Sequence, residues 1–160
     1  MKKYYYHITD NENWGDSILL KPKRDGFNRD SNEPHTPRIC VCPTIEQCMI
    51  AIYLSYGYSV YRTKHKEVAI SAKERIFDGH ITHEHWLKKP TQFIKVGTFN
   101  KRIPYNFGSS VALGDGTKES ENWQRNMLNK LRKKNLSFLT INKKFAKVLA
   151  NKEICHEKST

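Results

Sequence analysis

Residues 38 to 49, Arg-Ile-Cys-Val-Cys-Pro-Thr-Ile-Glu-Gln-Cys-Met, predict a buried strand that turns directly into a helix. The run from Arg38 to Cys42 is mostly apolar, and Pro43 ends it because proline cannot donate to a sheet ladder. Thr44-Ile-Glu-Gln47 is a capping box, in which the threonine oxygen caps the first turn and Gln47 returns the hydrogen bond. Apolar residues then recur at helical spacing. The stretch therefore indicates a fold that mixes strands and helices.

Other parts of the first hundred residues favour strands, loops and one more helix. Strands are expected at residues 3–8, 59–63, 67–70, 81–86 and 93–99. A second capping box, Thr9-Asp-Asn-Glu12, predicts a short helix with Trp14, Ile18 and Leu19 facing inward. Residues 21–38 have no period and are rich in proline and basic side chains, so they predict a long basic loop.

The C-terminal third predicts two basic amphipathic helices. One runs from Glu119 to Lys134, and its inward stripe comprises Trp123, Met127, Leu128 and Leu131. The second has the stripe Ile141, Phe145, Val148 and Leu149. We expect an α+β domain over residues 1–118 and a helical extension over 119–160 that packs on it as one globular unit.

The charge of the chain points to a polyanionic partner. The 160 residues carry a net charge of +12, and residues 118–160 hold 11 Lys and Arg against 4 Asp and Glu. Nucleic acid, DNA or RNA, is the simplest such partner, and an acidic protein is another. The alternative is that these lysines only solvate the surface of a protein from an AT-rich genome. The contact residues would be Arg125, Lys130, Arg132, Lys133, Lys134, Lys143, Lys144 and Lys147.

The sequence has no pattern typical of a membrane or secreted protein. No apolar run approaches the length of a membrane helix, and the N-terminus has no apolar signal region. We expect a soluble, cytoplasmic protein with no membrane contact. The sequence fixes no oligomeric state.

Two clusters of metal-ligand residue types are better explained without a metal. The four cysteines form no C-x-x-C pair, and Cys40 and Cys42 alternate within an apolar run, which favours buried free thiols on one face of a strand. Residues 80–86 read His-Ile-Thr-His-Glu-His-Trp, and on a strand His83 and His85 share one face while His80 and Glu84 share the other. Because the histidines are split, we expect no metal.

Glu84 leaves two interpretations open from the residues alone. A glutamate beside Thr82 and Trp86 can be a general base or an electrostatic partner for a developing cation. It can equally be a solvent-facing residue at the start of a strand.

The chain resembles the ADP-ribosyltransferase-like family, the fold of diphtheria-toxin-type and poly(ADP-ribose)-polymerase-type enzymes, over residues 3–100. Tyr5-Tyr-His-Ile-Thr9 is similar to the strand with the family's first-motif histidine. Residues 38–44 and the helix after them resemble the second motif. Ile81-Thr-His-Glu-His-Trp86, followed by residues 93–97, resembles the third-motif strand with the catalytic glutamate. The resemblance implies a small α+β fold with a split β-sheet and short helices.

The resemblance also implies roles for single residues. Glu84 and His7 would be catalytic, Glu84 by stabilising the oxocarbenium-like charge as nicotinamide leaves and His7 by holding the ribose of NAD. Thr82 stands where members that modify arginine have a second acid, which argues against that acceptor. NAD would be bound as a substrate by His7, Thr44, Tyr61, Tyr53, Arg24, Arg29 and Arg38.

Two classes of function are consistent with these features. The first is an NAD-dependent mono-ADP-ribosyltransferase, or a related RNA phosphotransferase, that acts on a nucleic acid or a protein held by the basic helices. The second is a non-enzymatic basic protein that binds nucleic acid or an acidic partner, like a small inhibitor encoded by a phage and acting in the host cytoplasm. The transferase depends on Glu84 and the binding protein does not.

Overall fold

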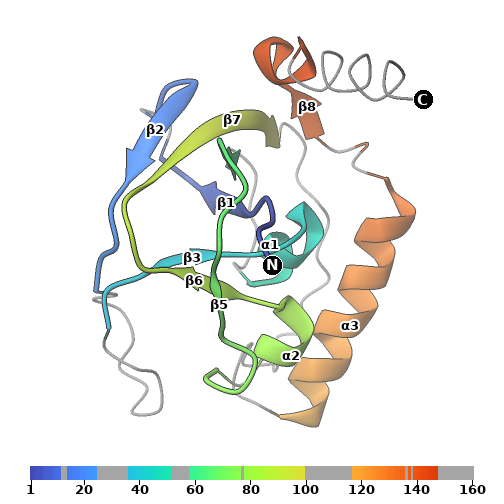
Figure 1. Ribbon diagram of the computed structural model, residues 1–160. Helices are drawn as coiled ribbons and strands as arrows, with labels where there is room; N and C mark the ends of the chain where they lie inside the picture. The colour runs from blue at the N-terminus through green and yellow to red at the C-terminus, as the bar shows by residue number, and fades with distance from the viewer. Residues whose placement is uncertain are drawn as a thin grey trace, which may run out of the picture.

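The computed structural model describes residues 1–11, 14–24, 36–51, 58–76, 78–99, 117–135, 137 and 139–147. Within them the chain is a mixed α+β fold built on two antiparallel sheets (Figure 1). This confirms the predicted α+β class. No helix in these ranges is long and apolar enough to pass through a bilayer.

The larger sheet is organised around the longest strand, β7. Its order is β1-β4-β7-β2, and β8 also pairs with β7. The first half of β7 pairs with β2 and its last three residues pair with β8, while β4 pairs along the other side. The strands are β1 (Tyr6–Thr9), β2 (Ser17–Leu20), β4 (Ser59–Thr63), β7 (Thr91–Phe99) and β8 (Leu139–Ile141).

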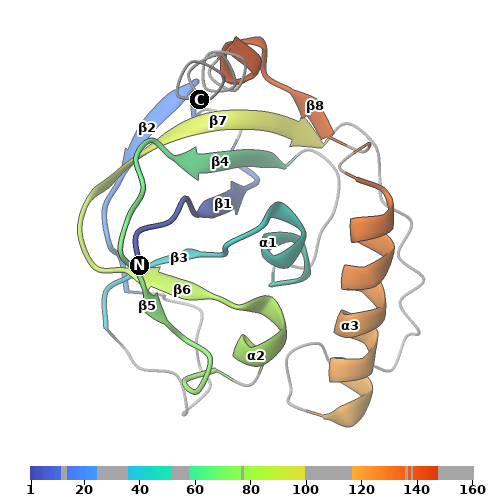
Figure 2. The same ribbon diagram turned by 45° about the vertical axis from the view of Figure 1, so that its right-hand side comes forward.

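The smaller sheet lies below the larger one in Figure 2 and meets it at β1. Its order is β3-β6-β5, with β3 (Ile39–Val41), β6 (His85–Leu87) and β5 (Ile70–Ser71). Tyr6 of β1 and Cys42, next to β3, exchange two backbone hydrogen bonds of 2.8 and 3.0 Å. The start of the chain is therefore joined to both sheets.

The helices α1 (Ile45–Ala51), α2 (Gly79–Thr82) and α3 (Lys118–Lys133) lie on the same side of the molecule (Figure 2). Helix α3 confirms the predicted first C-terminal helix. Thr117 accepts a hydrogen bond from the backbone N–H of Ser120 (3.2 Å), which caps its first turn, and Met127, Leu128 and Leu131 are buried.

Two apolar clusters fill the space around the larger sheet. On one face of the sheet, Ile8, Val60 and Val96 pack with residues of α1 and α3. On the other face, Tyr61 and Phe93 pack with β3 and β6. Neighbouring strand residues alternate between the two clusters because side chains alternate along a strand. His7 thus points to the opposite face from Ile8.

The helix predicted after the capping box Thr9–Glu12 does not form in residues 14–20, the part of that segment that the structure describes. Thr9 does accept a local hydrogen bond from the backbone N–H of Asn11 (3.1 Å), but residues 17–20 then form the strand β2. In this strand Ile18 packs into the core and Leu19 is 51% exposed, so the expectation for Leu19 is wrong. Trp14 packs inward as predicted, and Glu12 lies outside the described residues.

The strand predicted over residues 81–86 is wrong in its first half. Helix α2 ends at Thr82, His83 takes a left-handed conformation (φ 51°), and only then does β6 begin, at His85. The alternation predicted for the three histidines is therefore interrupted at His83.

The second predicted C-terminal helix also begins later than expected. Ile141 belongs to β8 and is half-exposed, while residues 143–147 are helical and Phe145 is buried. Val148 and Leu149 lie outside the described residues.

Candidate functional site

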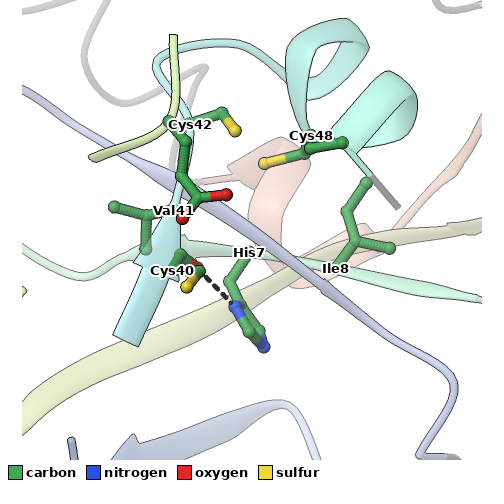
Figure 3. A pocket seen from close by; sticks show the side chains of 8 residues that line it. His7, Ile8, Cys40, Val41, Cys42 and Cys48 are labelled. Carbon is green, nitrogen blue, oxygen red and sulfur yellow. Dashed lines mark hydrogen bonds between the residues drawn. The ribbon is translucent and has the colours of Figure 1, made fainter. Parts of the chain in front are cut away.

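A small pocket lies where the two sheets meet. His7 and Ile8 line it from β1, Cys40 and Val41 from β3, and Glu84 from the turn before β6. The remaining lining residues are Cys42, Cys48 and Ala51. Its volume is about 80 Å³, so it accommodates one small polar group and not a whole dinucleotide. Figure 3 shows His7 below Cys40 and the sulfur atoms of Cys42 and Cys48 turned toward each other.

His7 is held in one orientation and one tautomer. Its Nδ1 lies 2.9 Å from the carbonyl oxygen of Cys40, which can only accept, so Nδ1 carries the proton (Figure 3). Burial lowers the pKa of His7, although the Cys40 carbonyl opposes this, and the ring is neutral. The ring stacks on Trp14 with centroids 5.8 Å apart. Nε2 is then a hydrogen-bond acceptor, and it has no partner among the described residues.

Glu84 is fixed through both its backbone and its side chain. Its N–H donates to Thr82 Oγ1 (3.3 Å), and its carbonyl accepts from the N–H of Ala72 (2.9 Å). The indole Nε1 of Trp86 donates to Glu84 Oε1 at 2.7 Å. A carboxylate held in this way is preorganised to face developing positive charge.

Trp86 is a buried support for this carboxylate. It is 1% exposed, and three cations lie over its ring, at 4.6 Å for Arg38, 5.7 Å for Arg75 and 5.3 Å for Lys88. The cation–π contacts hold the face of the indole ring, and the indole N–H donates to Glu84. The Glu84–Trp86 contact is local, since the two residues are two positions apart, whereas the contact of Arg38 with the ring forms only when β3 pairs with β6.

The three thiols of the pocket are free. Burial and the nearby charge of Glu84 raise the pKa of Cys40, and the hydrogen bond with Cys48 raises that of Cys42. The Cys48 thiol also lies 3.0 Å from the carbonyl oxygen of Tyr6. Since the thiolate is the nucleophile and metal ligand, the raised pKa values disfavour the reactive form of Cys40 and Cys42. This confirms the predicted free thiols at the three positions, whereas Cys155 lies outside the described residues.

The alternation of Cys40 and Cys42 along the sequence predicted that both side chains lie on one face of a strand, and both line the pocket.

Across the described ranges, no group of three or more His, Cys, Asp and Glu is arranged to hold a metal ion.

The predicted NAD residues fall into three groups. His7 and Glu84 come together in the pocket. Thr44 caps α1 instead, since its Oγ1 accepts from the N–H of Gln47 (3.2 Å) and donates to Gln47 Oε1 (3.0 Å). Tyr61 is fully buried in the core, and its hydroxyl lies 2.8 Å from the carbonyl oxygen of Gly15. Neither Thr44 nor Tyr61 lines the pocket.

The arginines predicted to meet the pyrophosphate are also separated. Arg38 is buried with its guanidinium over Trp86, next to the pocket wall. Arg24 is exposed. Arg29 and Tyr53 lie outside the described residues.

The residues predicted to contact nucleic acid are on the surface. Arg125 lies 3.9 Å from Glu121, one turn earlier on α3. Lys144 is less available than expected, because its Nζ lies 2.6 Å from Asp16 Oδ2. The other six, Lys130, Arg132, Lys133, Lys134, Lys143 and Lys147, are exposed.

No family model, curated protein or solved structure matches the chain.

Proposed function

We propose that the protein is an NAD-dependent ADP-ribosyltransferase-like enzyme whose catalytic residues are His7 and Glu84. The observation that carries the proposal is that these two residues, 77 positions apart in the chain, line one pocket from two different sheets. A histidine on the first strand and a glutamate at a strand of a second antiparallel sheet also fit the order of motifs in the resemblance.

His7 and Glu84 supply complementary contacts to a ribose. The neutral ring of His7 presents Nε2 as an acceptor for a ribose hydroxyl. The carboxylate of Glu84, held by Trp86, faces the same space. At about 80 Å³ the pocket is far smaller than the roughly 300–1,000 Å³ typical of ligand sites, so only the nicotinamide-side ribose would enter it. The rest of NAD would bind outside the pocket.

The reaction would break the bond between the ribose carbon and the nicotinamide nitrogen. The electron pair leaves with nicotinamide, and the ribose takes on oxocarbenium-like positive charge. Glu84 stabilises this charge, and a nucleophilic oxygen or nitrogen of the acceptor then bonds to the ribose carbon and gives up its proton. In the substrate the positive charge lies on the nicotinamide ring, and in the transition state it develops on the ribose. A carboxylate fixed beside the ribose therefore stabilises the transition state more than the substrate, which accelerates the reaction.

The test is release of nicotinamide from NAD with DNA, RNA and cell lysate as acceptors. Glu84→Gln keeps an oxygen for the Trp86 indole but removes the charge, so release should fall about 10²–10³-fold. His7→Asn keeps an N–H donor for the Cys40 carbonyl and removes Nε2, the atom that would accept from the ribose hydroxyl. This variant should therefore bind NAD more weakly. The matched controls Glu74→Gln and His65→Asn change exposed residues and should leave both quantities unchanged.

Absence of NAD binding and of nicotinamide release with every acceptor would contradict the proposal. So would an unchanged rate in Glu84→Gln.

A second candidate function rests on the exposed cations of α3. Lys130, Arg132, Lys133 and Lys134 lie at its C-terminal end, where they suit a nucleic-acid backbone. Replacing all four by Gln should weaken oligonucleotide binding and reduce its salt dependence, whereas Glu84→Gln should not. If the four-site variant binds as well as the parent protein, α3 is not the binding surface.

A further inference from the structure

Arg62 on β4 is a buried cation with an unusual environment. The residue is 4% exposed, and its guanidinium carbon lies 4.1 Å from the centre of the Tyr4 ring and 4.7 Å from that of Phe145. These three residues come from the N-terminal segment, the larger sheet and the helical residues 143–147. Flat stacking against aromatic rings holds a guanidinium in place and leaves its N–H edge for other contacts.

No carboxylate in the described part of the chain forms an ion pair with Arg62. Its buried Nε likewise has no hydrogen-bond partner there. A buried charge normally requires both, because it has given up its water shell. The two rings offset only part of this cost. The environment of Arg62 therefore suits an anion that the described residues do not provide.

A second cation lies against the same ring. Lys66 Nζ is 5.9 Å from the centre of Tyr4, so Arg62 and Lys66 converge on one aromatic side chain. Lys66, Lys143 and Lys147 are exposed. Arg62 also acts on the Tyr6 hydroxyl: burial and Glu46 raise the pKa of Tyr6, and the positive charge of Arg62 lowers it.

We infer that Arg62, stacked on Tyr4 and Phe145 and assisted by Lys66, binds a phosphate group of single-stranded nucleic acid. Guanidinium donors match phosphate oxygens in geometry, and charge-assisted hydrogen bonds are the strongest that a side chain makes. A backbone phosphate has further phosphates on either side, which the exposed Lys66, Lys143 and Lys147 suit. Arg62 does not line the pocket of His7 and Glu84, so phosphate binding at Arg62 can be tested independently of NAD binding.

The first test is thermal unfolding in inorganic phosphate and in sodium chloride of equal ionic strength. Phosphate should raise the melting temperature of the parent protein more than chloride does, because a ligand of the folded state stabilises it. In Arg62→Met the difference should disappear, and the variant without phosphate should melt at or above the parent temperature, since the uncompensated charge is gone. Lys89→Met, which removes an exposed cation just before β7, should keep the phosphate effect.

The second test is anisotropy of a fluorescein-labelled single-stranded DNA or RNA oligonucleotide. Arg62→Met should weaken its binding by about tenfold or more, the loss expected for hydrogen bonds to a charged group. If Arg62→Met does not fold, oligonucleotide binding is measured for Lys66→Met instead. Lys64→Met, which changes another exposed lysine, is its control.

Each other outcome overturns the inference. A phosphate effect equal in Arg62→Met and the parent places the anion elsewhere. A lower melting temperature of Arg62→Met, with unchanged phosphate and oligonucleotide responses, makes Arg62 structural. A lost phosphate effect with unchanged oligonucleotide binding makes the ligand a free phosphate.

Discussion

At the scale of single residues, the half-buried imidazole of His7 links folding to pH. Burial lowers the pKa of His7 below the ordinary value for histidine, and it lowers the pKa of His83 as well. The unfolded chain, with histidine pKa values near 6.5, therefore binds more protons than the folded chain as the medium becomes acidic. The free energy of unfolding should be at its full value above about pH 6.5 and should fall as the pH drops toward 5.

Chemical denaturation of His7→Asn at several pH values checks this assignment. The variant cannot take up the proton at position 7, so its stability should depend less steeply on pH than that of the parent. His65→Asn, which changes an exposed ring, should follow the parent. Identical pH profiles for His7→Asn and the parent would show that His7 is not the group responsible.

The hydrogen bond between Trp86 and Glu84 can be measured by a double-mutant cycle. Trp86→Phe keeps a buried aromatic ring but removes the N–H that lies 2.7 Å from the carboxylate. With Glu84→Ala as the second change, which removes the acceptor oxygen, the coupling energy should be about 1.5–3 kcal/mol, the range for a hydrogen bond to a charged group. A coupling near zero would mean that Trp86 does not hold the carboxylate in solution.

At the scale of elements, the close pairing of β7 and β8 depends on Gly97. A Cβ atom at this position would collide with the carbonyl oxygen of Thr140 and approach Leu139 Cγ to 3.1 Å. Gly97→Ala should therefore separate β8 from β7 and cost about 1–3 kcal/mol of unfolding free energy, as other overpacked sites do.

Gly15 offers a matched control for this change. A Cβ there meets nothing within 4 Å, so Gly15→Ala should change stability by less than about 0.5 kcal/mol. Hydrogen exchange of the Phe99 and Ile141 region should quicken in Gly97→Ala alone. Equal stability of the two variants would exclude tight β7–β8 packing.

The elements that were predictable are those with local causes. The β3–α1 unit follows from Pro43 and from the cap of Thr44 on Gln47, both within a few residues. Helix α2 has no such signal. It forms where the carbonyl of Asp78 accepts from the backbone N–H groups of Ile81 and Thr82, and where Gln124 of α3 donates to the Asp78 carboxylate (2.8 Å). That last contact spans 46 residues, so the local pattern of residues 80–86 favoured a strand.

The same distinction applies to the candidate site. His7 and Glu84 could be named because each belongs to a short motif of the family resemblance, His7 on the strand β1 and Glu84 directly before β6. The core position of Tyr61 could not be predicted, because its hydroxyl is satisfied by the backbone of residues 14 and 15 through tertiary folding. The contact of Arg38 with the Trp86 ring likewise forms only after β3 pairs with β6.

At the scale of the whole molecule, the net charge of +12 predicts stabilisation by salt. Like charges repel in the compact state, and the screening length shortens from about 10 Å at 0.1 M salt to about 3 Å at 1 M. The melting temperature should therefore rise as sodium chloride is added from low concentration. A fall would mean that ion pairs such as Lys144–Asp16 contribute more than the repulsion.

The position of the pocket between two sheets has a consequence for cooperative unfolding. Its walls come from β1 in one sheet and from β3 and the start of β6 in the other, so a subglobal opening that separates the sheets also destroys the pocket. A molecule bound to both His7 and Glu84 would make that opening rarer. Amide protons of the two sheets would then exchange more slowly together, which merges two foldons into one.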